Sequence, residues 1–522
     1  MKRSIRITVA LAVAAVVFAG QWFAHHSRGH RGSDPGHTHA AHYRLGRLEF
    51  TRCQLKTPQS GQTTAAWCAP FAQPENPADP GGPKITLRLA LIRSAAEHPA
   101  KDLVVYLAGG PGQSAINTWP LIAPALHSVL EHRDVVLLDQ RGTGGSHPLT
   151  CPQVQHAVAI EAARWDTSAA KRESRKERHA RQAAQIKSCL KEVEKTADPR
   201  YFTTTDAVHD LMALRRALGE PKFDLVGVSY GTLVAQQYAM RDPTGVRSMV
   251  LDSVVPNSVI LGENIPRDLH QALMADFALC TAEPACRKTI GNPATDLTEL
   301  RARLKRHDPL VHYPDPITNQ MRSRTLDEDV LARVVRLFAY SPITAALLPL
   351  TLHEAVQGDY VPLMAQANLI SGAVLPSMDV GMALTVTCSE DAPLLKPNPA
   401  NKDTLLGTRF IRNLRAECAL WPKGMMPADF HQPLHSAVPT LILEGQFDPV
   451  TPPRYGRQVL AGLRDGRLLI ARGQGHNVIG AGCMPHLVGK FIAHLHPKRL
   501  NARCLKALEP MPPFVSFSGA TP

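Results

Sequence analysis

The chain has 522 residues, of which 44% are hydrophobic and 20% charged, so it exceeds one minimal domain and can bury a substantial core. Its formal net charge of +13 is concentrated in two segments, since residues 1–50 hold seven Lys/Arg against two Asp/Glu and residues 171–195 hold nine against four. The remainder is nearly balanced and carries no recognition motif, so we do not expect a nucleic-acid partner.

The first 24 residues predict a signal peptide. Basic residues precede an uncharged apolar run, ITVALAVAAVVFAG, and small residues follow it. The run is shorter than the roughly 20 residues that span a bilayer comfortably. We therefore expect an exported protein, periplasmic or secreted, that is membrane-bound only if this segment stays uncleaved.

Residues 25–42 hold six histidines among Gly, Ser, Asp and Pro. This composition cannot bury a core and predicts a disordered linker, with a metal-binding tract as the alternative. We do not expect catalysis to depend on it.

Residues 43–256 predict the first part of an α/β core. ITLRLALIRS (85–94) alternates apolar and polar residues, as a half-buried strand does. Short, continuous apolar runs indicate strands buried on both faces of a parallel sheet, and they begin at residues 103, 134, 223, 248, 440 and 467. Helical patterns at 206–219 and 230–242 separate some of them, which favours an α/β fold with a mostly parallel sheet and flanking helices.

Two insertions interrupt this alternation. Residues 147–205 are polar and include the basic stretch KRESRKERHARQ, for which a solvated helix face is the preferred interpretation. Residues 257–436 look mostly helical, and we expect a large cap over the active edge of the sheet. Residues 437–510 then complete the core, and 511–522 form a tail.

Ten cysteines agree with export, because an even number in an exported chain suggests disulfides. Pairing of nearest neighbours would give five local loops, although spacing alone does not fix the connectivity. No C-x-x-C pair occurs, and we expect neither a metal nor an organic cofactor.

FDLVGVSYG (223–231) places Ser229 between Gly227 and Gly231, directly between an expected strand and an expected helix. This context is typical of a nucleophile elbow, where the serine has a strained backbone and its neighbours must be small. The alternative is an ordinary strand-to-helix turn that uses glycine only to bend.

An activated serine needs a base and an acid that orients the base. Asp448 follows one of the last two expected strands and His476 follows the other, so both would lie at the carboxyl edge of the sheet. We predict a triad of Ser229, Asp448 and His476. Asp252, at the end of an earlier strand, is the rival acid.

The oxyanion of acyl transfer needs N–H donors. The backbone N–H of Tyr230, directly after the serine, is one candidate. The loop AGGPGQS (108–114) offers a second, with Gly110 as first choice and Gly109 as the next.

The motifs GGPGQSA, LDQRGTGGS, LVGVSYG, LEGQFDPVTP and GQGH, in this order, resemble the proline iminopeptidase and tripeptidyl aminopeptidase branch of the α/β-hydrolases over roughly residues 85–500. The resemblance implies a serine peptidase that releases residues from peptide N-termini, with Ser229 as nucleophile, Asp448 as acid and His476 as base. Ala108 stands where smaller members often have histidine, which suits the larger, exported branch.

Two further pairs of charged residues remain to be interpreted. Asp139 and Arg141, in DQRGTGGS, are expected to brace the loops beneath the site. An aminopeptidase also needs a carboxylate for the substrate's α-ammonium group, and Glu390 and Asp391 in the cap are the candidates, against the plainer interpretation of a solvated or capping pair.

We therefore expect an exported serine aminopeptidase whose partner is a peptide with a free N-terminus, with its oligomeric state left open. A carboxylesterase for small or lipid esters is the alternative, because the same triad serves both. A catalytically inactive hydrolase fold used for binding is the third interpretation.

Overall fold

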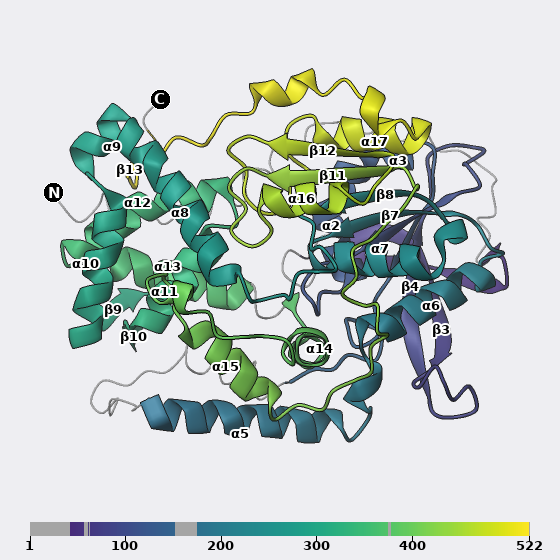
Figure 1. The fold of residues 1–522 in the computed structure, drawn as a ribbon, viewed down its shortest axis with the longest axis horizontal. Coiled ribbons are helices and arrows are strands. Elements are labelled where there is room, and N and C mark those ends of the chain that lie inside the picture. The colour runs from purple at the N-terminus through teal and green to yellow at the C-terminus, as the bar shows by residue number, and fades with distance from the viewer. Residues whose placement is uncertain (1–41, 57–60, 62, 152–174, 374–376, 521–522) are drawn as a thin grey trace.

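In the computed structural model, which describes residues 42–56, 61, 63–151, 175–373 and 377–520, a ten-stranded sheet lies beside a helical cap (Figure 1). The expected signal peptide, most of the His-rich linker and part of the basic stretch lie outside the described residues. Within them, no helix is long and apolar enough to span a membrane.

The sheet has the strand order β1-β2-β3-β4-β6-β5-β7-β8-β11-β12. The strands β1 to β4 pair antiparallel with one another, and β4 pairs antiparallel with β6. The remaining six strands are mutually parallel, in the order β6-β5-β7-β8-β11-β12. The bounds are β1 His42–Leu45, β2 Leu48–Lys56, β3 Thr63–Pro74, β4 Lys84–Ile92, β5 Leu103–Leu107, β6 Val135–Leu138, β7 Phe223–Val228, β8 Val246–Asp252, β11 Thr440–Gly445 and β12 Gly466–Ala471. The expected mostly parallel sheet is confirmed.

Helices cover both faces of the sheet, which is why its central strands are mostly apolar and buried. In β5, Val105 belongs to one buried cluster and Val104 to the other. The first cluster includes residues of α6 (Thr204–Ala217), α7 (Tyr230–Arg241) and α16 (Pro453–Leu460). The second includes residues of α2 (Ala115–Ile122), α3 (His127–Leu130) and α17 (Met484–His494). Successive strand side chains point to opposite faces, so each face receives its own core.

The long insertion between β8 and β11 packs in two parts. Most of its helices enclose a separate apolar cluster: α8 (Ile265–Ala282), α10 (Pro293–Arg306), α11 (Glu328–Phe338), α12 (Pro342–Val356) and α13 (Val361–Ala373). The small hairpin β9 (Leu310–Pro314) and β10 (Met321–Thr325) joins them. The later helices α14 (Val380–Val386) and α15 (Arg409–Cys418) contribute instead to the sheet's own cluster. The expected mostly helical insertion is therefore present, and its last third packs with the core.

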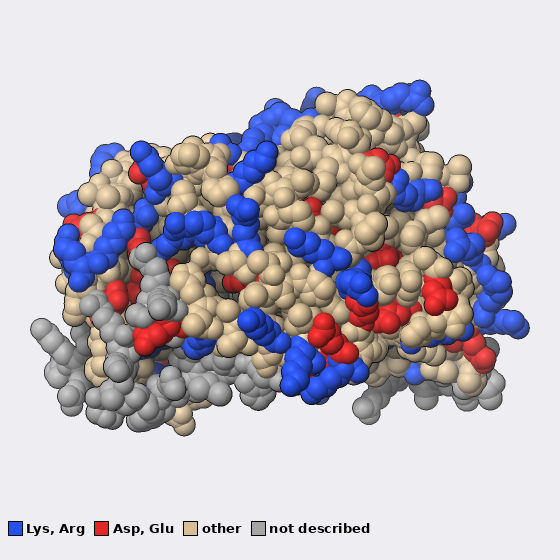
Figure 2. All heavy atoms as spheres, turned by 60° about the horizontal axis from the view of Figure 1, so that its bottom comes forward, with Lys and Arg blue, Asp and Glu red and all other residues tan. Residues whose placement is uncertain are grey.

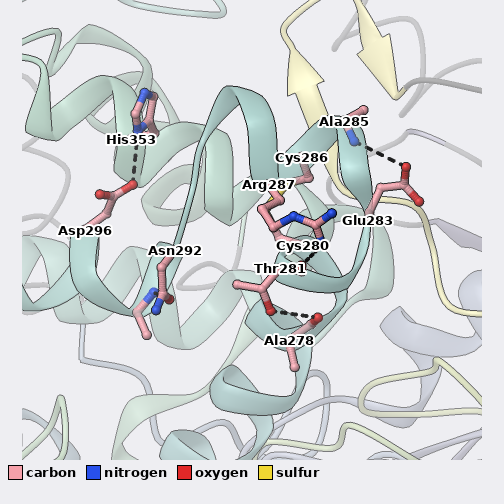
Figure 3. Close-up of a disulfide and its surroundings, with 11 residues drawn as sticks. Ala278, Cys280, Thr281, Glu283, Ala285, Cys286, Arg287, Asn292, Asp296 and His353 are labelled. Carbon is pink, nitrogen blue, oxygen red and sulfur yellow. Dashed lines mark hydrogen bonds and ion pairs between the residues drawn. A yellow bond between two sulfur atoms is a disulfide. The ribbon is translucent and has the colours of Figure 1, made fainter.

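Five disulfides join the ten cysteines, each to its nearest neighbour in sequence: Cys53–Cys68, Cys151–Cys189, Cys280–Cys286, Cys388–Cys418 and Cys483–Cys504. Figure 3 shows the Cys280–Cys286 bridge, which ties the end of α8 to the short helix α9 (Pro284–Thr289). Such bridges persist in oxidising compartments.

Charge is mixed on the face that carries α5 (Arg175–Val193) and α15. Figure 2 shows Lys and Arg side chains spread over this face and interspersed with Asp and Glu, with no single continuous basic field. The helix α5 includes most of the basic segment 171–195, so this face carries one of the two segments in which the sequence concentrates its excess positive charge.

Candidate active site

Ser229 occupies the sharp turn between β7 and α7. Its backbone has φ 53° and ψ −121°, a region that non-glycine residues rarely adopt. The Ser229 N–H donates to the carbonyl of Asp252 at the end of β8, at 2.8 Å, which holds the turn against the neighbouring strand. This is the strained strand-to-helix geometry of a nucleophile elbow.

The two flanking glycines are required by close backbone approaches. A Cβ on Gly227 would lie 2.5 Å from the carbonyl oxygen of Gly231. A Cβ on Gly231 would lie 2.1 Å from the carbonyl oxygen of Leu107, the last residue of β5. A larger residue at either position would push the elbow away from the sheet, so the G-x-S-x-G pattern has a steric cause here.

Asp448 and His476 meet at the carboxyl edge of the sheet, as predicted. Asp448 follows β11 and His476 follows β12, and the imidazole Nδ1 lies 2.7 Å from Asp448 Oδ2. Asp448 also accepts hydrogen bonds from the N–H groups of Val450 and Thr451 and from the Thr451 hydroxyl. These donors fix the carboxylate, which in turn fixes the ring that it contacts.

The two groups shift each other's protonation. Burial raises the pKa of Asp448, but the charge of His476 and the hydrogen bonds from His476 and from the backbone of Thr451 and Val450 outweigh it, and the pKa of Asp448 falls below its ordinary value. Burial lowers the pKa of His476, but Asp448 outweighs it, and the pKa of His476 is raised. An ionised acid beside an imidazole is the arrangement that stabilises an imidazolium during catalysis.

Asp252, the rival acid, holds the histidine loop. Its two carboxylate oxygens accept the N–H groups of Val478 and Ile479, at 2.9 and 3.0 Å. Burial raises the pKa of Asp252 to about 6, against the effect of these donors. Sequence reasoning identified Asp252 only by its strand end, and the backbone contacts that define its place could not be read from the chain.

The loop after β5 lies against the serine. A Cβ on Gly109 would be 3.3 Å from the Cβ of Ser229, whereas Gly110, with φ 114°, turns within its own loop toward Gly112. These contacts place the Gly109–Gly110 turn beside the serine, and Gly110 remains the first choice of donor and Gly109 the second. Tyr230 begins α7, where backbone N–H groups lack helical partners. The oxyanion role of these residues stays a prediction.

The side chain of Tyr230 points into a buried polar chain. Gln140 donates to the Tyr230 hydroxyl at 2.9 Å, that hydroxyl lies 2.7 Å from Thr204 Oγ1, and Thr204 Oγ1 donates to Glu390. This chain connects the residue after the serine to a short π-helix, Thr387–Asp391, in the insertion.

Glu390 and Asp391, the expected amine anchors, are both buried. Glu390 accepts from the N–H and hydroxyl of Thr204, and Asp391 accepts from the N–H of Leu261. Burial raises the pKa of Glu390 well above its ordinary range and that of Asp391 to about 8. Both carboxyl groups are enclosed and accept internal hydrogen bonds, so their anchor role stays a prediction without support from this geometry.

Asp139 and Arg141 brace neighbouring loops, as expected. Asp139 accepts from Ser114, which caps α2, and from the backbone of Ile116 and Gly145. Arg141 forms a bidentate pair with Asp210 of α6, with both distances 2.7 Å. Both side chains are buried, so they fix the loops beside the elbow without facing the site.

Among the described residues, no group of three or more His, Cys, Asp or Glu side chains is arranged to hold a metal. At one edge of the sheet the structure places a strained serine, an acid–imidazole pair and a glycine-rich loop.

Comparison with known proteins defines the family. Residues 102–482 match the family described as alpha/beta hydrolase fold, which is more than half of the chain. The chain belongs to this family. Serine protease Hip1 of Mycobacterium tuberculosis (strain H37Rv) is 26% identical over 505 residues, covering 90% of this chain and 93% of that protein. These matches identify a serine hydrolase with relatives that are named as peptidases.

A tripeptidyl aminopeptidase of Streptomyces coelicolor is 32% identical over 197 residues, covering 36% of this chain and 35% of that protein. Among solved structures, a proline iminopeptidase of Mycobacterium smegmatis is similar, at 14% identity and a TM-score of 0.39, over 82% of this chain and 98% of that one. The name of the Streptomyces relative belongs to the branch that the sequence motifs resemble.

Proposed function

We propose that this hydrolase is an exported serine exopeptidase that cleaves peptides near a free N-terminus through an acyl-enzyme. The observation that carries the proposal is the convergence of three strand ends: the elbow serine after β7 and the bonded Asp448–His476 pair after β11 and β12. The relatives named serine protease and tripeptidyl aminopeptidase support peptide bonds as the substrate.

In the proposed reaction, Ser229 Oγ attacks the scissile carbonyl and gives its proton to His476 Nε2. The backbone N–H of Tyr230 and one N–H of the Gly109–Gly110 loop receive the oxyanion. His476 returns the proton to the leaving amine, which departs as the acyl-enzyme forms. Water then attacks the ester, with His476 as base, and releases the acid and free Ser229.

Asp448 acts on His476 in this scheme. Its carboxylate holds the ring by Nδ1, which leaves Nε2 for the serine proton, and its charge stabilises the imidazolium. The five disulfides and the N-terminal segment support export as the setting.

A carboxylesterase with the same triad is the second candidate. The burial of Glu390 and Asp391 favours it, because these two carboxyl groups are then not available for a substrate ammonium. The triad chemistry is indifferent to whether the leaving group is an amine or an alcohol.

A paired assay separates the two candidates. Aminoacyl and tripeptidyl anilides with free N-termini are compared with their N-acetylated forms and with short acyl esters. We expect hydrolysis of the free-amine anilides, reduced by acetylation. Turnover of blocked esters with none of free-amine anilides would establish the esterase and reject the peptidase.

A further inference from the structure

The cap makes direct contact with the histidine of the acid–imidazole pair. Tyr340 lies between α11 and α12, far in sequence from the loop after β12. Its carbonyl oxygen accepts the backbone N–H of His476 at 2.8 Å. Its ring packs against the imidazole in an edge-on arrangement, with centroids 5.1 Å apart and planes at 70°. One cap residue therefore contacts both the backbone and the ring of His476.

The same contact requires a glycine at position 475, directly before His476. A Cβ on Gly475 would lie 2.3 Å from the carbonyl oxygen of Tyr340 and 3.3 Å from that of Ala339. Gly475 is not in a left-handed conformation, so glycine is needed there for space and not for backbone freedom. The cap backbone therefore packs so closely against the histidine loop that one added methyl group would disturb the contact.

The cap holds Tyr340 firmly in place. Phe338 and Ala339 are buried in the cap's own apolar cluster. The Tyr340 N–H bonds to the carbonyl of Leu337, and the Thr344 hydroxyl donates to that of Phe338. Tyr340 thus takes its position from the packing of α11 and α12, and any displacement of these helices would be transmitted to His476.

We propose that Tyr340 is a positioning residue for the catalytic base, so that the cap, besides covering the site, takes part in catalysis. The inference rests on the proposed function, in which His476 is that base. The histidine loop is then held from two sides. Asp252 in the core binds the N–H groups of Val478 and Ile479, and Tyr340 in the cap binds that of His476.

The Tyr340 ring and its carbonyl make separable contributions. The described hydrogen bonds include none from the Tyr340 hydroxyl, so the ring acts by packing. Tyr340→Phe should keep kcat within about twofold. Tyr340→Ala should lower kcat about 10- to 100-fold while KM changes less than threefold, because a base misplaced by a fraction of an ångström loses this much.

The matched control is Tyr360→Ala. Tyr360 is also a half-buried cap tyrosine, but its hydroxyl contacts Arg303 and its ring packs against the cap's own apolar cluster. A general loosening of the cap would affect both alanine variants, whereas positioning of the base would affect only Tyr340→Ala.

The reaction of Ser229 with a fluorophosphonate provides a readout that does not depend on substrate binding in the cap. We expect Tyr340→Ala to slow this inactivation by the same factor as kcat, and Tyr340→Phe and Tyr360→Ala to leave it unchanged. Inactivation of Tyr340→Ala at the wild-type rate, or a rise in KM alone, would overturn the proposal.

Gly475→Ala keeps the test decisive if Tyr340→Ala does not fold. The added methyl group should lower kcat and slow the inactivation, while Gly480→Ala, which meets no atom within 4 Å, should do neither. If both glycine variants had the same kcat and the same inactivation rate, the contact between Tyr340 and the histidine loop would have no role in catalysis. A Ser229→Ala protein that still reacts with the fluorophosphonate would instead reject the proposed function itself.

Discussion

The carboxyl edge of the sheet and the helical cap are built on different principles. At the edge, each reactive group follows a buried parallel strand and is fixed by neighbouring backbone, as Ser229 is by Asp252 and Asp448 by Thr451. The helices α8 and α10–α13 of the cap enclose a separate apolar cluster, and Tyr340, just after the end of α11, contacts the edge from this part of the cap. The edge therefore sets the chemistry, and we expect the cap to modulate it.

The largest expected effect comes from the edge. Ser229→Ala should lower kcat/KM by about 10⁴-fold or more, since it removes the nucleophile. The measurement is hydrolysis of the best anilide or ester, with covalent fluorophosphonate labelling followed by mass spectrometry. Ser258→Ala, at the start of the insertion and bonded to Gln458, is the control and should retain activity. Full activity of Ser229→Ala would refute the mechanism.

Substitution of the two buried acids at the edge, Asp448 and Asp252, should lower kcat by different factors. Asp448→Asn should lower kcat by about 10⁴-fold, because the amide no longer holds the correct tautomer or stabilises the imidazolium. Asp252→Asn should cost about 10- to 100-fold, because it only loosens the Val478–Ile479 anchor. Steady-state kinetics of both variants decide the rank, and the reverse order would make Asp252 the acid.

The pH profile should report the raised pKa of His476. Protonated imidazole cannot accept the serine proton, so kcat/KM should fall about tenfold per pH unit below this pKa, which lies above the ordinary value of about 6.5. Asp448, whose pKa is lowered, stays ionised across this range. A profile of kcat/KM from pH 5 to 9 tests this, and an acidic limb centred below 6.5 would contradict it.

The buried carboxyl groups of the insertion should have a smaller and unselective effect. Glu390→Gln keeps the size of the side chain and replaces a carboxyl group whose pKa burial raises well above its ordinary range. We expect kcat/KM to fall by less than about tenfold, and equally for free-amine and N-acetylated substrates, because a lost buried hydrogen bond costs about 1 kcal/mol. A rise in KM confined to free-amine substrates would restore Glu390 as the amine anchor.

The smallest effect on turnover should come from the distal cap. Replacing Cys280 and Cys286 together by serine removes a short cross-link, worth about 2 kcal/mol of stability for a loop of this length. Urea unfolding should show this loss, while kcat stays within about twofold. A large loss of kcat without a loss of stability would mean that this part of the cap also contributes to the chemistry.

The sequence by itself determined the catalytic edge. Apolar runs buried on both faces form parallel strands, and the residues that follow such strands must gather at one edge, so the meeting of Asp448 with His476 was predictable from chain order. The strain at Ser229 was predictable too, because its glycine neighbours indicate crowding.

Only the tertiary structure decided which side chains are buried and which distant segments meet. Glu390 and Asp391 were chosen for their charge, but packing encloses them, and the contact of Tyr340 with His476 joins segments whose separate sequences carry no sign of it. Local patterns record the period and the ends of strands, whereas contacts between a cap and a core depend on how two independently packed clusters fit together.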